Sequence, residues 1–350
     1  MRYAIYDQCL ESDIELPGLQ TASEGRAVDV VFRVLSAGAG PVPVPAPQGR
    51  AHAFHGTDGT VMVELYELPH QYVLRFPDAA DFWIEADGSR VDCHLLRDLP
   101  VGIIGHLLLG WVCTLTLPLR GLGVLHASAV AMGGRAIGFA GPPGRGKSTL
   151  VSAMGLAGWP VLTDEVLAIR ESSTRPYALP GDPRIRLNAG VARELEESAG
   201  PLPIARDEAF AKVALVPDGI RLRAATEALP LGTIYLLEHL DGPDDPIDFR
   251  PLDPREAPGA LLEHTFRIPR WHGELVRAQF RMLCDLAGSV PVVRIAYPRD
   301  VRRLPEVISA IREREASASS PAHAAPREQG LQPARAQLSP NNPEVALSLP

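Results

Sequence analysis

Apolar and polar positions alternate with strand spacing through the first 98 residues of the chain. Short apolar runs bounded by turn residues recur there, and period-two alternation is typical of half-buried β-strands. The runs that show it best are 28–35, 59–67, 71–76 and 81–88. Residues 36–50, rich in proline, glycine and alanine, predict a linker or long loop. We therefore expect a small β-rich N-terminal domain over residues 1–98.

A long apolar segment follows, in which no charged residue interrupts Leu99 to Leu119. Its length would suffice to span a bilayer. However, it contains prolines, glycines and a histidine, and the sequences on both sides resemble those of soluble proteins. We therefore favour a buried core helix over a membrane span. The N-terminus has no apolar run after Arg2 and does not resemble a signal peptide.

The middle of the chain predicts a compact order of strands and one helix. In chain order the segments are two strands at 123–132 and 135–140, a helix at 147–158 and a strand at 159–170 interrupted by two acidic residues. Gly133-Gly134 separates the first two strands and indicates a hairpin, because tight hairpin turns need positive φ. The helix has Leu150, Met154 and Ala157 on one face, and Gly158 is placed to end it.

Beyond residue 176 the pattern alternates between strand and helix spacing. We expect a strand turning into a helix over 184–200, a strand at 231–240, helices at 258–270 and 273–290, a strand at 291–300 and a closing helix near 302–314. Residues 315–350 are rich in alanine, proline, serine and glutamine without periodicity, which predicts a disordered tail. Together these elements predict an α/β (α+β) chain, with a second domain over 99–314.

Net charge and cysteine usage exclude several classes of partner. A formal net charge of −8 provides no electrostatic basis for binding nucleic acid or an anionic membrane. The four cysteines are widely scattered, so we expect reduced thiols in a cytoplasmic protein and neither a disulfide framework nor a zinc site. Only Lys147 and Lys212 among the 34 basic residues are lysine, which indicates that position 147 needs a compact ammonium. For Lys212 an ordinary surface lysine is the alternative.

The strongest signal is a phosphate-binding loop of the form G-x-x-x-x-G-K-[ST]. The residues expected to hold a nucleotide are Gly141, Pro142, Pro143, Gly144, Arg145, Gly146, Lys147, Ser148 and Thr149. Glycines let successive backbone N–H groups point at phosphates, and the helix that follows adds its N-terminal dipole. In such a loop Lys147 reaches the β and γ oxygens of ATP, and the Ser148 hydroxyl ligates Mg²⁺. The alternative is a chance Gly/Pro turn before a surface helix.

Two acidic residues, Asp164 and Glu165, close the strand that follows this helix. A Mg²⁺-nucleotide site usually needs an acid from a neighbouring strand, and these two lie 17 and 18 residues after Lys147. One carboxylate could hold Mg²⁺ through water and the other accept a proton from an attacking hydroxyl. The alternative is an acidic turn at a strand end. His126 lies in the strand paired with the one that feeds the loop, and taken alone it is typical of a core histidine.

The stretch 125–169, "LHASAVAMGGRAIGFAGPPGRGKSTLVSAMGLAGWPVLTDEVLAI", resembles the catalytic core of the HPr kinase/phosphorylase family. That family has the same order of histidine-bearing strand, hairpin, phosphate loop, helix and strand ending in two acids. A looser similarity extends over residues 90–310. The resemblance implies a P-loop domain with a mixed sheet, similar to that of phosphoenolpyruvate carboxykinase. It also implies phosphoryl transfer from ATP, or sometimes pyrophosphate, to a serine hydroxyl of a protein or peptide.

The same resemblance implies roles for individual residues. Asp164 would be the general base, Ser148 and Glu165 would lie on the metal side, and His126 would lie near the phosphate beside Lys147. The loop departs from the true enzyme at Pro142-Pro143 and at Thr149, and the second acid is Glu165 rather than aspartate. These departures favour an acceptor other than HPr, such as a small peptide precursor of a natural product.

Three functions stay open from the sequence. The first is a Mg²⁺-ATP-dependent serine kinase of a protein or peptide, with which a homo-oligomer is compatible. The second is a kinase of a small hydroxylated metabolite on the same core, and the third is a nucleotide-binding regulator without catalysis. Asp164 beside Lys147 argues against the third, because an occupancy sensor needs no base. Basic residues that could contact substrate or phosphate are Arg184, Arg186, Lys212 and Arg267.

Overall fold

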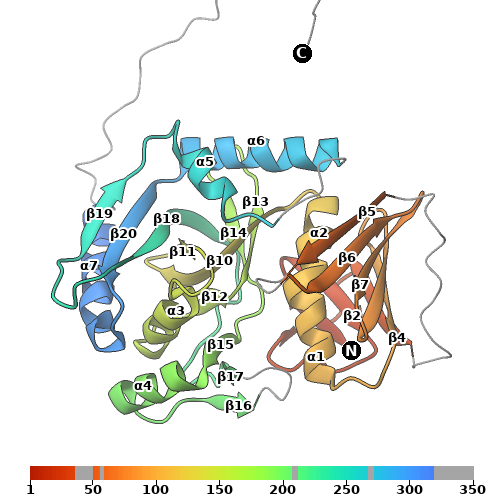
Figure 1. Cartoon of the computed structure of the whole chain (residues 1–350), viewed down its shortest axis with the longest axis horizontal. Helices are drawn as coiled ribbons and strands as arrows, with labels where there is room; N and C mark the ends of the chain where they lie inside the picture. The colour runs from red at the N-terminus through yellow and green to blue at the C-terminus, as the bar shows by residue number, and fades with distance from the viewer. Residues whose placement is uncertain (36–49, 56–58, 207–211, 267–271, 319–350) are drawn as a thin grey trace, which may run out of the picture. The chain divides into compact units, whose positions relative to one another are not determined.

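The computed structural model of the chain describes residues 1–35, 50–55, 59–206, 212–266 and 272–318 (Figure 1). The chain divides into two compact units, residues 1–308 and 309–350, and the site described below lies within the first. Of the predicted linker only residue 50 is described, and of the predicted tail only 315–318. The division at residue 98 stays a prediction.

The N-terminal residues form one large sheet, as the alternating pattern indicates. Within the described residues it has nine strands in the order β3-β1-β2-β4-β9-β8-β7-β6-β5. Their bounds are β1 Arg2–Ile5, β2 Gln8–Ser12, β3 Gln20–Thr21, β4 Val30–Leu35, β5 Arg50–His55, β6 Val61–Glu67, β7 Gln71–Phe76, β8 Ala80–Glu85 and β9 Arg90–Leu95. The four strands expected from the alternation correspond to β4, β6, β7 and β8.

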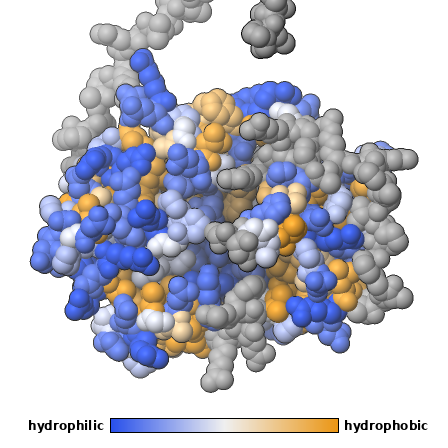
Figure 2. Space-filling view, in the orientation of Figure 1, coloured by the Kyte–Doolittle hydropathy of each residue, from blue (hydrophilic) through white to orange (hydrophobic). Residues whose placement is uncertain are grey.

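The long apolar segment is a helix that lies between this sheet and the rest of unit 1 (Figure 1). It comprises α1 Val101–His106, a π-helical stretch Leu107–Val112, and α2 Cys113–Leu119. By length and composition it could cross a membrane. However, Leu108, Leu109 and Val112 are buried in a hydrophobic core, as expected for a core helix. Side chains of the N-terminal sheet and of a second sheet, described next, belong to the same core. Hydrophilic residues cover much of the face that Figure 2 shows.

The second sheet is mixed and has eight strands within the described residues. Its strands are β10 Gly123–Met132, β11 Arg135–Ala140, β12 Val161–Thr163, β13 Val166–Arg170, β14 Tyr177–Leu179, β18 Leu229–Leu240, β19 Asp248–Pro251 and β20 Val292–Pro298. The hairpin glycines Gly133 and Gly134 have φ of 57° and 74°, as the tight turn between β10 and β11 requires. The predicted mixed α/β class is thereby confirmed.

The remaining helices and a small sheet lie between and after these strands in the chain. They are α3 Lys147–Leu156, α4 Ala189–Ala199, α5 Ala257–Leu262, α6 Gly273–Ser289, a 3₁₀ turn at Val301–Arg303 and α7 Leu304–Ala318, with a small sheet of β15 Ile185–Asn188, β16 Ile204–Arg206 and β17 Lys212–Leu215. Two predicted bounds are wrong. The helix expected at 258–270 ends at Leu262, and the closing helix continues four residues past 314, where the tail was expected to begin.

Strand direction determines where the functional residues gather. β11, β18 and β20 are parallel, and β12 runs the same way as β11 because both pair antiparallel with β10. The carboxyl ends of all four strands therefore lie at one edge of the sheet, which is where open α/β sheets bind ligands. The phosphate loop leaves β11 at this edge, and Asp164 follows β12.

The turn between β1 and β2 of the N-terminal sheet packs against the segment that follows β14. The backbone N–H of Tyr6, in the turn between β1 and β2, donates to the carbonyl of Pro180 over 2.7 Å. Beside it, a Cβ atom on Gly181 would lie 2.5 Å from both Tyr6 Cε1 and Thr163 Oγ1. Only glycine fits at this position, because real Cβ atoms do not approach that closely.

We expect Gly181→Ala to lower the free energy of unfolding by about 1–3 kcal/mol, the usual cost of overpacking. Gly190→Ala in α4 is the matched control, because a Cβ atom added there would have open space within 4 Å. Urea denaturation of both variants measures the difference. Equal stability of the two variants would show that Tyr6 can shift away from the added methyl group at no measurable cost in free energy.

Candidate nucleotide and phosphoryl-transfer site

The phosphate loop has the backbone that its glycines permit. Gly144 and Gly146 have φ of 82° and 81°, in the left-handed region that residues with a side chain rarely adopt. Helix α3 begins directly after Gly146, at Lys147. As predicted, Leu150 and Met154 are fully buried, but Ala157 is exposed because α3 ends at Leu156. The loop thus joins a buried strand to the N-terminus of a helix, an arrangement that suits anion binding.

Lys147 is buried at the base of the loop. The residue is only 7% exposed in the fold, and Nζ donates to the carbonyl of Gly141 over 2.7 Å. Burial lowers the pKa of Lys147, while the charges of Asp164 and Glu165 oppose that shift. The ammonium therefore stays close to two carboxylates and to the loop in which a phosphate chain would lie.

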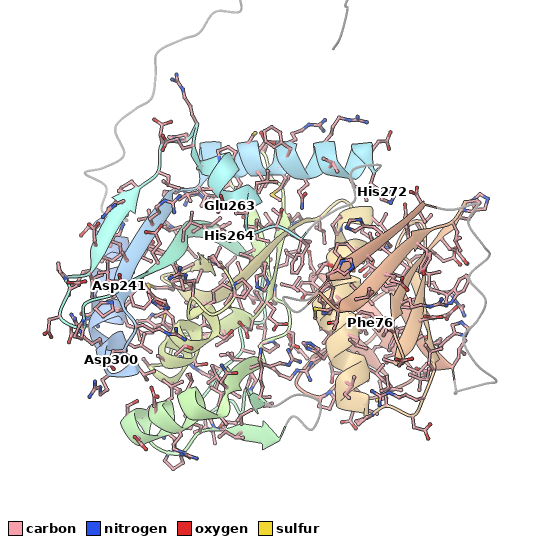
Figure 3. The ribbon with its side chains drawn as sticks, viewed as in Figure 1. Phe76, Asp241, Glu263, His264, His272 and Asp300 are labelled. Atoms are coloured by element: carbon pink, nitrogen blue, oxygen red, sulfur yellow. The ribbon has the colours of Figure 1, made fainter. Side chains whose placement is uncertain are left out.

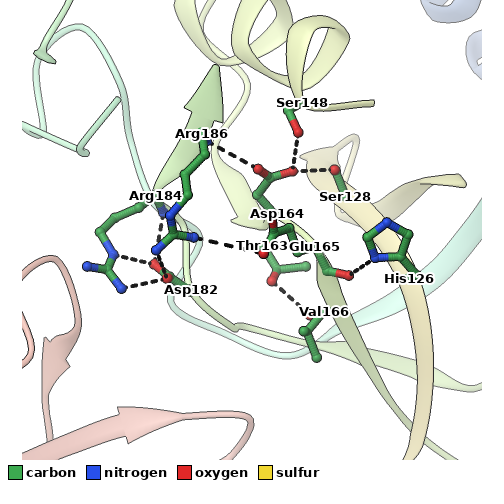
Figure 4. Close-up of polar contacts among 10 residues, drawn as sticks. All are labelled: His126, Ser128, Ser148, Thr163, Asp164, Glu165, Val166, Asp182, Arg184 and Arg186. Carbon is green, nitrogen blue, oxygen red and sulfur yellow. Dashed lines mark hydrogen bonds and ion pairs between the residues drawn. The ribbon is translucent and has the colours of Figure 1, made fainter. Parts of the chain in front are cut away.

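Asp164 is held by three donors (Figure 4). Its Oδ1 accepts hydrogen bonds from Ser128 Oγ at 2.5 Å and Ser148 Oγ at 3.0 Å, and its Oδ2 accepts one from the backbone N–H of Arg186 at 3.4 Å. Burial raises the pKa of Asp164, and these hydrogen bonds act in the opposite direction. Ser128 was not predicted from the sequence. The signal was there, because residues two apart on a strand share a face and Ser128 follows His126 by two.

Glu165 has strained backbone and a more open side chain. Its φ is 72°, which is costly for a residue with a side chain and typical of functional sites. The side chain is 27% exposed, with Oε2 lying 4.0 Å from Nη1 of Arg186. Burial and then the charge of Asp164 raise the pKa of Glu165. Two like charges side by side disfavour full ionisation of both.

His126 lies behind Glu165 and is neutral. Its Nδ1 is 3.2 Å from the backbone carbonyl of Glu165, and its backbone N–H donates to the carbonyl of His264 (labelled in Figure 3) over 2.7 Å. Burial, with the charge of Lys147, lowers the pKa of His126 to about 4. The histidine is thus both near the phosphate loop and largely packed, against Phe266 at 5.5 Å between ring centroids.

The predicted basic residues divide into three groups. Arg186 and Lys212 line a cavity of about 360 Å³ beside the phosphate loop, together with Lys147 and Ser148. Arg184 does not line it, because its guanidinium makes a two-point ion pair with Asp182 at 2.8 and 2.7 Å. Arg267 lies outside the described residues. Pro142, Pro143 and Arg145 are exposed on the loop and do not line this cavity.

Asp182 is a second residue of the site that was not predicted from the sequence. Besides its ion pair with Arg184, its carboxylate has Oδ2 at 3.8 Å from Nη2 of Arg186. One carboxylate therefore orients both arginines of this segment. Its pKa is lowered, because the charges of Arg184 and Arg186 outweigh the effect of burial. Arg186 thus stands between Asp182 and the two acids of the site.

The donor set suits magnesium better than a softer metal. No cluster of three or more histidine, cysteine or acidic residues that could hold a metal occurs in the described part of the chain. Instead, the Ser148 hydroxyl donates to the Asp164 carboxylate over 3.0 Å, and Glu165 is the next residue in the chain. Mg²⁺ is usually bound by one or two carboxylates, waters and substrate phosphates, so these residues fit it.

Comparisons with known proteins include a distant structural likeness. No protein-family model matches the chain, and no curated protein matches it. Among solved structures, the HPr(Ser) kinase/phosphatase from Coxiella burnetii is similar at 13% sequence identity and a TM-score of 0.31. The match covers 56% of this chain and 99% of that one.

Proposed function

We propose that this chain is an ATP-dependent kinase that transfers the γ-phosphoryl group to a serine hydroxyl of a protein or peptide. The observation that carries the proposal is the 3.0 Å hydrogen bond between Ser148, next to the loop lysine, and Asp164. It joins a phosphate-binding loop to a buried acid, with Glu165 beside it. A site that only held a nucleotide would need no such pair of carboxylates at its γ end.

The contacts favour a different division of roles from the one that the resemblance implies. Asp164 is 4% exposed and accepts three hydrogen bonds, one of them from the hydroxyl expected to ligate Mg²⁺. This supports a place for Asp164 and Ser148 on the metal side. The Glu165 side chain is 27% exposed and its pKa is raised, which suits a proton acceptor. When bound, Mg²⁺ would neutralise charge on the phosphates.

The proposed step balances as an in-line displacement. The acceptor's serine oxygen forms a bond to the γ-phosphorus, and the bond between that phosphorus and the bridging β–γ oxygen breaks, so ADP leaves. The hydroxyl proton passes to the carboxylate of Glu165. Lys147 stabilises the charge on the phosphate oxygens, and Arg186 holds Glu165 in place. His126 supports the Glu165 backbone through its carbonyl.

Labelled ATP tests this function. The protein is incubated with γ-labelled ATP, Mg²⁺ and candidate peptides, each with a serine-to-alanine counterpart, and Asp164→Ala is compared with wild type. We expect label on the serine peptide only, and none with Asp164→Ala. Asp244→Ala, at an exposed acid of the loop after β18, is the control and should act like wild type.

The same assay separates the two alternatives. Label in a small hydroxylated metabolite but in no peptide would indicate the metabolite kinase. Bound ATP without any labelled acceptor, and no effect of Asp164→Ala, would contradict the kinase and indicate a nucleotide-binding regulator.

A further inference from the structure

Two aromatic side chains at the carboxyl ends of β18 and β20 lie against the phosphate loop. His239 and Tyr297 are register partners on these parallel strands, with rings in a T-shaped arrangement and centroids 5.4 Å apart. Both line the cavity beside the loop. A Cβ atom on Gly146 would lie 3.4 Å from Tyr297 Oη and 3.6 Å from His239 Cε1. The pair therefore packs beside Gly146, the residue just before α3.

The polar atoms of this pair are buried without partners. Tyr297 is 2% exposed, and neither its hydroxyl nor the His239 ring nitrogens form a hydrogen bond with the described residues. An unpaired buried hydroxyl costs free energy, so its presence at a cavity wall indicates that a ligand meets it. Burial, with the charges of Arg145 and Arg299, lowers the pKa of His239. The neutral ring offers one donor and one acceptor nitrogen.

Strand order decides which end of a nucleotide this pair would meet. Across the sheet the strands run β12, β10, β11, β18, β20, with the phosphate loop leaving the central β11. The acids that follow β12 lie on one side of the loop, and His239 and Tyr297 lie on the other. Asp241 and Asp300, labelled in Figure 3, continue the chain just beyond the pair.

We propose that Tyr297 and His239 bind the ribose of the nucleotide. The inference rests on the proposed function for one point, the placing of the γ-phosphate beside Asp164 and Glu165. With the γ end on the β12 side, a phosphate chain lying along the loop directs its nucleoside end toward β18 and β20. There the Tyr297 hydroxyl donates to a ribose oxygen, and the imidazole N–H of His239 does the same.

Tyr297→Phe separates ligand binding from mere support of the loop. We expect ADP affinity, measured by calorimetry, to fall about five- to tenfold with the loss of one hydrogen bond. Affinity for inorganic tripolyphosphate, which has no ribose, should stay as in wild type. The melting temperature without nucleotide should stay equal or rise, because the variant removes an unpaired buried hydroxyl.

His239→Phe keeps the ring packing while removing both nitrogens, and we expect the same selective loss of ADP affinity. Tyr66→Phe, in the N-terminal sheet, is the control and should leave both affinities unchanged, since that hydroxyl bonds to Glu64 at 3.1 Å and does not line the cavity.

Unchanged ADP affinity in Tyr297→Phe, or an equal loss for ADP and tripolyphosphate, would overturn the inference. Both measurements use binding alone, so a wild-type protein that binds ADP but transfers no phosphoryl group would contradict the proposed function and leave the inference standing. A wild-type protein that binds neither ligand would contradict both.

Discussion

Lys147→Met is expected to lower the rate of phosphoryl transfer by about 10²–10³-fold, the usual cost of removing a charged group that stabilises developing negative charge. The ammonium is buried, donates to the Gly141 carbonyl over 2.7 Å, and lies close to both acids of the site. Methionine matches the length of the chain and removes the charge. The affinity for ATP, measured by calorimetry, should fall together with the rate.

Lys147→Arg is the matched variant, because it keeps the charge and changes only its shape. We expect it to be nearly as defective as Lys147→Met, since a planar guanidinium is larger and cannot replace a compact ammonium in a closed loop. Full activity in Lys147→Arg would show that charge alone matters. It would also remove the reason for a lysine at 147 in a chain whose other basic residues are almost all arginine.

Glu165→Gln is expected to lower the rate of transfer by about 10²–10⁴-fold, the range for loss of a general base. The amide keeps the size of the side chain and its place beside Arg186. ADP affinity should therefore stay near that of wild type, and the effect should appear in kcat rather than in KM for ATP. Single-turnover measurements with labelled ATP would separate the two.

The pH profile gives an independent reading of the same residue. A base must be deprotonated to accept a proton, and burial beside Asp164 raises the pKa of Glu165. Wild-type activity should therefore fall, as the pH is lowered, at a higher pH than an ordinary carboxyl would give, and Glu165→Gln should lose that acidic limb. Glu171→Gln, at an exposed acid after β13, should keep the wild-type profile. An unaltered pH profile in Glu165→Gln would indicate that Asp164, and not Glu165, is the general base.

Elements with a local signal were predicted well. The Gly133-Gly134 turn, helix α3 and the strands β6 and β7 follow from residue types and spacing within a few positions of each other. The hairpin of β1 and β2 was missed, because its turn consists of Tyr6 and Asp7. These residues have φ of 53° and 58°, and the turn contains no glycine or asparagine from which positive φ could have been predicted. Contacts with the rest of the fold hold that turn in place.

The same difference between local signals and long-range contacts applies to the site. The phosphate loop and the two acids lie within 25 residues, so their spacing alone indicated a nucleotide site. Ser128, Asp182, His239 and Tyr297 come from separate parts of the chain, and only sheet pairing brings them to the loop. Their individual residue types carry no signal of that pairing.

By itself the sequence determined the elements and the chemistry of the loop, because helical and strand periodicity and the φ freedom of glycine act over a few residues. Tertiary structure alone decided which strands are neighbours, and so which side of the loop meets the acids and which meets the Tyr297 hydroxyl. It also decided that Asp164 is enclosed by donors while the Glu165 side chain stays partly exposed. Burial and the pairing of distant strands depend on the whole chain, and these two properties underlie the roles that we propose for the two acids.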